Sequence, residues 1–306
     1  MSSSQNSAVA EVVLGRRPSS TTATLVHKLA AIKRFARRKP MGGFGLAMVI
    51  ILVTVAVIAP LVAMEDPYAI SGRDRLQGPS AAHLFGTDDL GRDVFARVVY
   101  GSRISIQVGI ISVVISTVVG TAVGLFSGYI GGVTDLVVQR IVDALMALPL
   151  LIFALAIVAA LGPSITNVMV AVGLALSPGL SRVVRGSVMS VRQNLYVEAA
   201  RSIGASDVRI VSQHVLPNVL APIIVLATAG LGGAILAEGS LSFLGLGTPP
   251  PTPSWGGMLS GSSRTYFERA PWLAVFPGLA LTIAVLGFNT LGDGLRDYLD
   301  PRLRDR

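Results

Sequence analysis

Long apolar segments alternate with polar stretches along most of this chain. A helix needs about 20 mostly apolar residues to cross the hydrocarbon core of a membrane. The first apolar segment contains no charged residue, and the fourth is shorter and weaker than the others. The pattern predicts six transmembrane helices, at residues 44–64, 104–130, 142–161, 165–180, 219–241 and 272–291.

The composition supports this interpretation. Of the 306 residues, 52% are hydrophobic and only 14% are charged, and the mean hydropathy is +0.67. A soluble domain carries about 25% charged residues, so this chain lacks the polar groups to cover a water-exposed surface. The sequence therefore predicts an all-α polytopic membrane protein. It contains no cysteine, which excludes disulfides, thiolate metal sites and cysteine nucleophiles.

The basic residues set the expected orientation. The formal net charge is +8, and eight of the basic residues precede Phe44. With that tail in the cytoplasm, cytoplasmic segments hold 18 of the 25 lysines and arginines, in agreement with the positive-inside rule. This placement favours a membrane role for the tail over binding of nucleic acid. We therefore expect a cytoplasmic tail at residues 1–43, an extracytoplasmic loop with an amphipathic helix at 65–103, and a cytoplasmic tail at 297–306.

Motifs for catalysis are absent from the sequence. There is no Gly-Lys pair and so no phosphate-binding loop, and there is no HExxH or GxSxG motif. His27, His83 and His214 fall in a tail, an outer loop and an inner loop, so no metal cluster is predicted. We expect no catalytic residue, no metal and no cofactor bound by this chain. An external partner must then supply the energy for any work.

Glycines recur at every fourth position of the second span. On a helix such glycines form one stripe, where the missing side chains let another helix approach closely. We interpret the stripe as a packing surface, with lining of a channel as the alternative. The glycines are Gly120, Gly124, Gly128 and Gly132.

Two acidic residues lie in or near apolar segments. Charged groups inside a membrane are costly and usually face a bundle interior or an aqueous cavity. Asp143 starts the third span, and we expect it to be solvated near the inner boundary. Glu238 lies near the outer end of the fifth span and is a candidate for the pathway or a gate. The alternative for Glu238 is an interface position paired with an arginine.

The segment between the fourth and fifth spans, residues 185–218, is long and helical in pattern. We expect two short amphipathic helices, broken near Gly204 and stopped by Pro217. Apolar residues at every fourth position predict one contact face, and hence a surface that meets a partner. A helix lying on the membrane surface is the alternative. The residues of the face are Leu195, Ala199 and Ile203.

At these residues the sequence resembles a known family. Glu198-Ala199-Ala200, followed by Gly204 and Leu216-Pro217, is similar to the EAA motif of permease subunits in ABC importers. His214 departs from the generic motif, where many such permeases have isoleucine, but the HVLPN form is common in the peptide branch. Three further stretches resemble the C-type permease of oligopeptide and dipeptide importers: residues 86–105, 238–259 and 291–304.

The resemblance implies a fold, a set of partners and a site. The fold is that of a type I ABC importer permease with six spans, a core at residues 104–296 and a coupling loop at 185–218. The partners are a homologous second permease, two ATPase subunits that bind ATP and magnesium, and an extracytoplasmic substrate-binding protein. The location is a bacterial cell membrane. The residues expected to couple the chain to an ATPase are Glu198, Ala199, Ala200, Arg201, Gly204, Leu216 and Pro217.

The function that the resemblance implies is import of oligopeptides or dipeptides. Members of the same subfamily handle nickel, glutathione or other small solutes, so these remain alternatives. A gradient-driven secondary transporter would need internal repeats and paired intramembrane charges. A membrane-embedded enzyme would need the motifs that the sequence lacks.

Two outer stretches stand apart from the spans. A charged cluster precedes the second span, and we interpret it as an interfacial amphipathic helix, or alternatively as a docking surface for a binding protein. In the loop before the sixth span, the prolines at 249–251 predict an extended segment, and Trp255 is expected to anchor it at the membrane interface. The residues of the charged cluster are Asp88, Asp89, Arg92 and Asp93.

Overall fold

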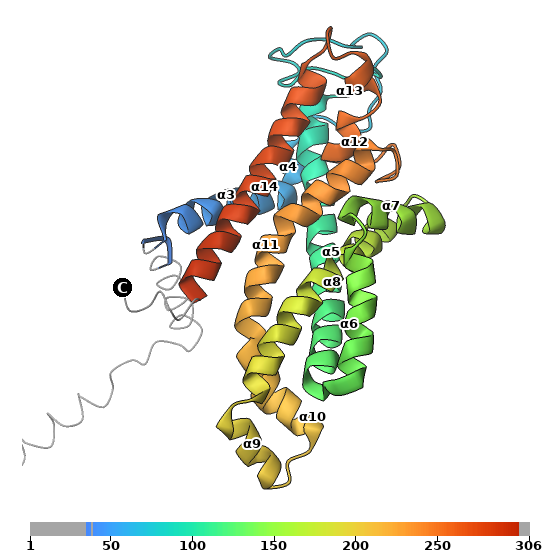
Figure 1. Cartoon of the computed structure of the whole chain (residues 1–306). Coiled ribbons are helices and arrows are strands. Elements are labelled where there is room, and N and C mark those ends of the chain that lie inside the picture. Colours follow the sequence, from blue (N-terminus) through green and yellow to red (C-terminus); the bar gives the residue numbers. More distant parts are fainter. Residues whose placement is uncertain (1–34, 38, 300–306) are drawn as a thin grey trace, which may run out of the picture.

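The computed structural model describes residues 35–37 and 39–299, and all of its regular elements are helices. Most of both predicted tails, at 1–34 and 300–306, therefore lies outside the described residues. Figure 1 shows the helices as one elongated bundle. In chain order they are α3 (Pro40–Val57), α4 (Ala59–Val62), α5 (Val94–Ile130), α6 (Gly132–Met146), α7 (Leu150–Leu161), α8 (Ile165–Arg192), α9 (Leu195–Ser202), α10 (Asp207–Ile210), the π-helix η1 (Val211–Val215), α11 (Leu216–Phe243), α12 (Trp255–Leu259), α13 (Ser262–Thr265) and α14 (Trp272–Leu299).

Five helical segments are long and apolar enough to cross a membrane: α3, α5, α8, α14 and the segment that joins α10, η1 and α11. The pair α6 and α7 also meets this test, but its two helices are bent by 91°. The predicted count of six spans therefore holds if the bent pair is one span. The prediction of a single straight helix at 142–161 is wrong. Helix α6 begins ten residues earlier, and the chain turns before Pro149, which directly precedes α7.

Helix α5 begins ten residues earlier than the predicted span. Its 37 residues span about 55 Å at 1.5 Å per residue, well beyond the hydrocarbon thickness of about 30 Å. Asp93 caps the helix, because its carboxylate accepts a hydrogen bond from the N–H of Ala96 at 2.7 Å. The separate amphipathic helix predicted within 65–103 is not formed: residues 65–93 make turns and bends, and 94–103 are the first turns of α5.

Helices α8 and α11 also exceed the predicted spans. Helix α8 has 28 residues and passes through Pro178 without ending. Contrary to the prediction, Pro217 does not stop a helix but lies in the first turn of α11, directly after the wider turn of η1. The preceding η1 carries the chain directly from α10 into α11. The predicted loop at 185–218 is thus reduced to α9 and the two short turns beside it.

Helices α5 and α8 lie in backbone contact along a glycine seam. A Cβ added to Gly120 would lie 2.8 Å from the carbonyl oxygen of Ser177, and one added to Gly124 would lie 2.6 Å from that of Ser181. Gly128 is similarly close to α8. Gly132 does not belong to this seam, contrary to the predicted stripe. It starts α6 with a φ of +59° and has open space where a Cβ would be.

Three apolar clusters fill the bundle. One lies between α5, α7, α8 and α11, a second joins the ends of α8 and α11 to α9 and α10, and a third joins α5, α11 and α14 to α12. Helix α3 packs across α14 at one edge (Figure 1). There Lys39 lies 3.3 Å from Asp297. The two ends of the bundle are therefore connected by continuous packed helices.

The glycine seam predicts that the same substitution has different effects inside the seam and outside it. Gly124→Ala would force a methyl group against the backbone of α8, and overpacking of this kind costs about 1–3 kcal/mol. Gly186 lies on α8 with open space around its missing side chain, so Gly186→Ala should be neutral or slightly stabilising. Thermal unfolding of the two purified variants would measure the difference. Equal unfolding temperatures for both variants would contradict the tight packing at Gly124.

Candidate functional site

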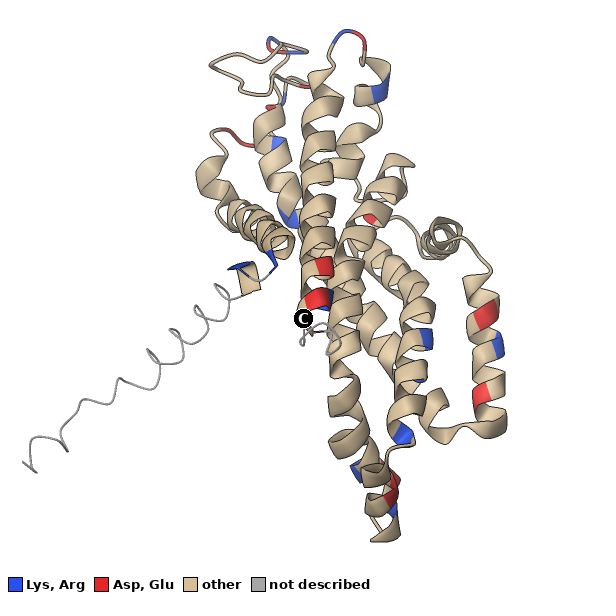
Figure 2. Cartoon of the chain, turned by 60° about the vertical axis from the view of Figure 1, so that its left-hand side comes forward, with Lys and Arg blue, Asp and Glu red and all other residues tan. Residues whose placement is uncertain are grey.

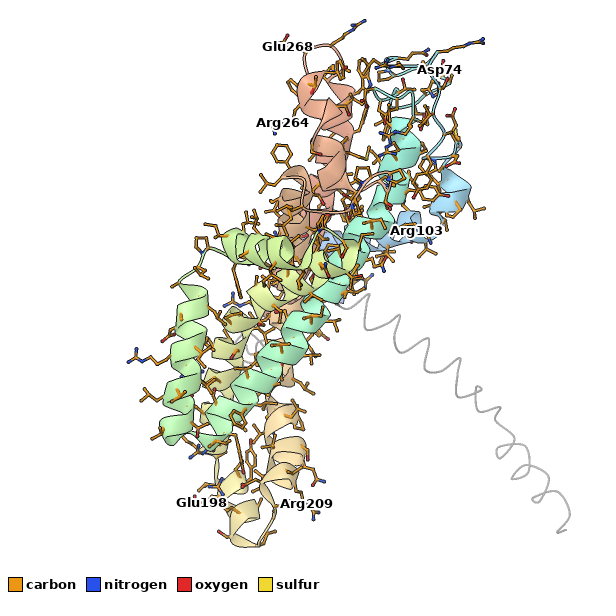
Figure 3. The ribbon with its side chains drawn as sticks, turned by 90° about the vertical axis from the view of Figure 1, so that its right-hand side faces the viewer. Asp74, Arg103, Glu198, Arg209, Arg264 and Glu268 are labelled. Carbon is orange, nitrogen blue, oxygen red and sulfur yellow. The ribbon has the colours of Figure 1, made fainter. Side chains whose placement is uncertain are left out.

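The candidate functional site lies at one tip of the bundle, in the segment that we call the coupling hairpin (residues 193–210). Figure 3 shows Glu198 and Arg209 at this tip, and Asp74, Arg264 and Glu268 at the opposite end. The two ends are built differently. The coupling hairpin consists of two short helices. The opposite end, which we call the outer end after the orientation that the sequence predicts, consists of irregular loops with the two short helices α12 and α13.

Helix α9 owes its ends to local backbone chemistry. Glu198 lies in its first turn and Arg201 in its last, which complements the helix dipole. Beyond it, Gly204 has a φ of +83° and its N–H bonds the carbonyl of Arg201 at 3.0 Å, while the N–H of Ala205 bonds that of Ala200 at 3.1 Å. This pair of bonds is a Schellman motif, whose left-handed position favours glycine.

The two faces of α9 have different environments. Val197 and Ala200 are buried against the ends of α8 and α11. The face formed by Leu195, Ala199 and Ile203 points away from the chain, and the side chains of Leu195 and Ile203 are 82% and 86% exposed. The structure therefore divides the predicted EAA residues, because Ala199 is on the free face whereas Ala200 is part of the core.

A polar node at Tyr129, near the end of α5, fixes the coupling hairpin from the side. The phenol donates to the carboxylate of Asp207 at 2.5 Å and accepts from Arg201 at 3.5 Å. The carbonyl of Tyr129 accepts from Arg192 at 2.7 Å. Leu216 packs against the same apolar cluster. The hairpin is thus joined to three long helices, and a displacement of α9 would be passed on to them.

Ion pairs connect α6, the first helix of the bent pair, to α8. Arg185 donates to both carboxylate oxygens of Asp135, at 2.5 and 2.6 Å, and Arg182 donates to Asp143. Figure 2 shows acidic positions on α6 and basic positions on a helix beside it. Asp143 does not start a helix, contrary to the prediction, but lies three turns into α6. Its side chain is 47% exposed, as the expected solvated position requires, and its charge is paired.

Glu238 does not line an open pathway in this structure. It is 0% exposed and lies between α5 and α11. Ser242 donates to its carboxylate at 2.7 Å and Ser105 at 3.3 Å. Among the described residues no arginine pairs with it, so the alternative with an arginine partner is not formed there. A role of Glu238 in a pathway or a gate stays a prediction. The residue joins two helices near the outer end.

Charged residues of the outer end form two compact groups. Asp88 accepts from Arg92 at 2.6 Å and lies 3.7 Å from Arg97. Asp93 and Glu65 both approach Nδ1 of His83, at 3.1 and 3.6 Å. The sequence did not predict the second group, because nothing in the spacing of these residues indicates that Glu65 lies near His83.

The group at His83 has three atoms that could ligate a metal, all within 4.8 Å of one another. Both carboxylates contact the same ring nitrogen, however, and Asp93 also caps α5. This is the arrangement of a hydrogen-bonded histidine. Trp255, predicted as an interface anchor, is instead buried, and its indole N–H donates to the carbonyl of Val98 at 3.0 Å.

Comparison with known proteins agrees with this geometry. Residues 120–305 match the family described as "Binding-protein-dependent transport system inner membrane component", and residues 30–79 match "N-terminal TM domain of oligopeptide transport permease C". Among solved structures, the chain is similar to one of inward-facing conformations of the MetNI methionine ABC transporter. The TM-score is 0.56 at 19% identity, over 67% of this chain and 96% of that one.

Curated relatives are similar over nearly the whole chain. The dipeptide transport system permease protein DppC of Alkalihalophilus pseudofirmus is 45% identical over 90% of both chains. A putative peptide transport system permease protein of Brucella suis is 45% identical over 89% of this chain and 91% of the relative. The glutathione transport system permease protein GsiD of Shigella flexneri is 47% identical over 89% of both. This multi-pass chain is a permease subunit of ABC importers and belongs to the family of binding-protein-dependent transport system inner membrane components.

Proposed function

We propose that this chain is the permease subunit of an ATP-driven importer of dipeptides or oligopeptides. The observation that carries the proposal is the exposed apolar face of α9, presented by a helix that is fixed to the bundle on its other face. The names of the relatives favour peptides as the cargo. A relative that transports glutathione is about as similar, so a glutathione-like solute is the second candidate.

The coupling hairpin is suited to transmit force from an ATPase subunit. Exposed Leu195 and Ile203 would enter a groove of that subunit, while the buried Val197 and the node at Tyr129 hold the helix to α5, α8 and α11. Closure of two ATPases can move a transmembrane bundle only through such a rigid element. In this proposal ATP and magnesium bind to the partner ATPases, and this chain has no ATPase site of its own.

The bent pair α6 and α7 is the proposed contact with a second, homologous permease. Its outward surface is strongly apolar, since Leu136, Ile141 and Ile152 are 58–59% exposed. Within this chain, α7 extends sideways from the bundle (Figure 1). A translocation pathway would then lie between the two permeases. A secreted binding protein would deliver the solute to the outer end.

A gradient-driven transporter is less consistent with the charges. Such a transporter needs an intramembrane group that can exchange an ion or a proton. Asp135 and Asp143 are each paired with an arginine of α8, and Glu238 is enclosed by serine hydroxyls. Neither nickel import nor enzymatic activity is favoured by a specific feature of the described residues.

Orientation in the membrane is the first testable part of the proposal. We expect the coupling hairpin and both termini in the cytoplasm. The cysteine-free chain allows single cysteines to be placed at exposed positions on the two ends, Gln193→Cys and Glu268→Cys. In intact cells an impermeant maleimide should label the cysteine at position 268, and should label the one at 193 only after permeabilisation. The reverse pattern would contradict the orientation.

The exposed face of α9 gives the second test. Ala199→Asp and Ile203→Asp place a charge on the free face without entering the core, so both variants should insert normally. We expect a loss of co-purifying ATPase subunits, or at least a tenfold fall in substrate-stimulated ATP hydrolysis, because an unpaired charge in an apolar groove costs several kcal/mol. Gly204→Ala should have a related effect through strain at its positive φ.

The matched control is Ala81→Asp, an equally exposed alanine of the outer loop. It should leave both the ATPase content and the ATP hydrolysis unchanged. Ala200→Asp is a poor probe, since Ala200 is only 7% exposed and its substitution would disturb the core. Normal coupling in both Ala199→Asp and Ile203→Asp would show that this face does not dock an ATPase.

A further inference from the structure

A cavity of about 480 Å³ lies at the outer end of the bundle. Arg92 and Arg97 form one side of it, and the loop between α11 and α12 arches over the other. A smaller hollow of about 60 Å³ shares both arginines and adds Asp88. The combined site is concave, and its size falls in the range of about 300–1,000 Å³ that is usual for small-molecule sites.

The arching loop is fixed at both of its ends. Trp255 anchors α12 through its bond to the carbonyl of Val98. At the other end, Ser242 donates to buried Glu238 and accepts from the N–H of Thr248 at 3.3 Å. Glu238 thus holds the cavity wall through Ser242. The wall is therefore formed before any ligand arrives, which reduces the entropic cost of binding.

The charges of the cavity do not balance. Its two guanidinium groups share one carboxylate, Asp88, since Asp89 does not line either hollow. Asp88 is already occupied: one oxygen accepts from the N–H groups of Leu90 and Arg92, both at 2.9 Å, and the other accepts from the Arg92 side chain. Among the side chains that line the cavity, one positive charge therefore remains in excess, although Asp89 acts on Arg97 from outside the lining.

Hydrogen-bond donors remain unused as well. Arg97 is 7% exposed, and its Nη1 donates to the carbonyls of Pro67 at 2.9 Å and Pro251 at 3.5 Å. Among the described residues, no acceptor bonds Nη2 of Arg97 or either terminal nitrogen of Arg92. A guanidinium carries five donors and matches a carboxylate in a planar, two-point contact. The cavity thus has both the charge and the donors for one carboxylate.

We propose that this cavity binds the carboxylate group of a small transported solute at the outer end of the permease. The proposal rests on the proposed function and names the part of the substrate that this chain recognises. A carboxylate neutralises the single excess charge, which a doubly charged phosphate would overcompensate. The remaining wall accepts an uncharged solute body of varied shape, because it offers apolar surface and hydroxyls from Pro163, Pro249, Met258, Thr252 and Ser260.

The test measures binding directly, without a binding protein. Full-length chain would be reconstituted in lipid nanodiscs, and alanyl-alanine and alanyl-alanine amide would be titrated by saturation-transfer NMR. The two probes differ only in the terminal carboxylate. Hydrogen bonds to a charged group contribute enough that the amide should bind about ten- to a hundredfold more weakly. Equal affinities for the two probes would overturn the proposal.

Two variants locate the binding site. Arg92→Gln removes one guanidinium but leaves Asp88 near Arg97, and should weaken binding of alanyl-alanine at least tenfold. Thr252→Trp fills the cavity while both arginines stay in place, and should abolish binding even if Arg92→Gln proves unstable. Arg269→Gln, an exposed arginine of the same end that does not line the cavity, is the matched control and should bind normally. Normal binding in Thr252→Trp would overturn the assignment.

Failure of this proposal is distinguishable from failure of the proposed function. If the wild-type chain retains coupled ATPase subunits but binds neither probe, the importer function stands and the cavity assignment falls. If Arg92→Gln instead weakens capture of the substrate-binding protein and the dipeptide does not bind, the arginines dock that protein, which also overturns the proposal. Dipeptide binding without any ATPase association would support the cavity and contradict the importer.

Discussion

Backbone contact between α5 and α8 is the constraint on which the other features depend. The two helices touch where Gly120, Gly124 and Gly128 lack side chains. Lipid gives helices no hydrophobic reason to associate, so close van der Waals packing must hold them together. Because α5 carries Arg97 at one end and Tyr129 at the other, this contact also joins the outer cavity to the coupling hairpin by one stiff body.

Three carboxylates of the bundle are compensated by neighbouring groups. Asp135 and Asp143 are paired with arginines of α8, and Glu238 is surrounded by serine hydroxyls. Leaving any of these carboxylates unpaired in a membrane would cost several kcal/mol. The pairs on α6 hold a bent helix that would otherwise have little packing to keep it against α8. The serines at Glu238 instead fix the wall of the outer cavity.

Hydropathy located the spans well because each one is a long apolar run, but it could not show where a span bends. The 91° bend between α6 and α7 depends on how a few residues before Pro149 turn, and apolar content is the same for a bent and a straight helix. The contacts of Trp255 and Glu238 could not be predicted for a related reason. Their partners, Val98 and Ser105, lie more than 130 residues away in the sequence, so no local pattern reveals them. The apolar spacing of Leu195, Ala199 and Ile203 correctly predicted the outward face of α9, whereas docking of an ATPase on that face stays a prediction.

The π-helix η1 has a consequence for how this chain can change in length. It joins the coupling hairpin to α11 through a turn that holds one residue more than an α-helical turn would. Removing one residue from Val211–Val215 would return this turn to α-helix and leave the direction of the exposed face of α9 nearly unchanged. A deletion in the regular α-helix of α11 would instead turn everything before it by about 100°. Single-residue deletions should therefore be tolerated in η1 and in the irregular loop at 65–82, yet rare in the first turns of α11, in functional descendants of this sequence.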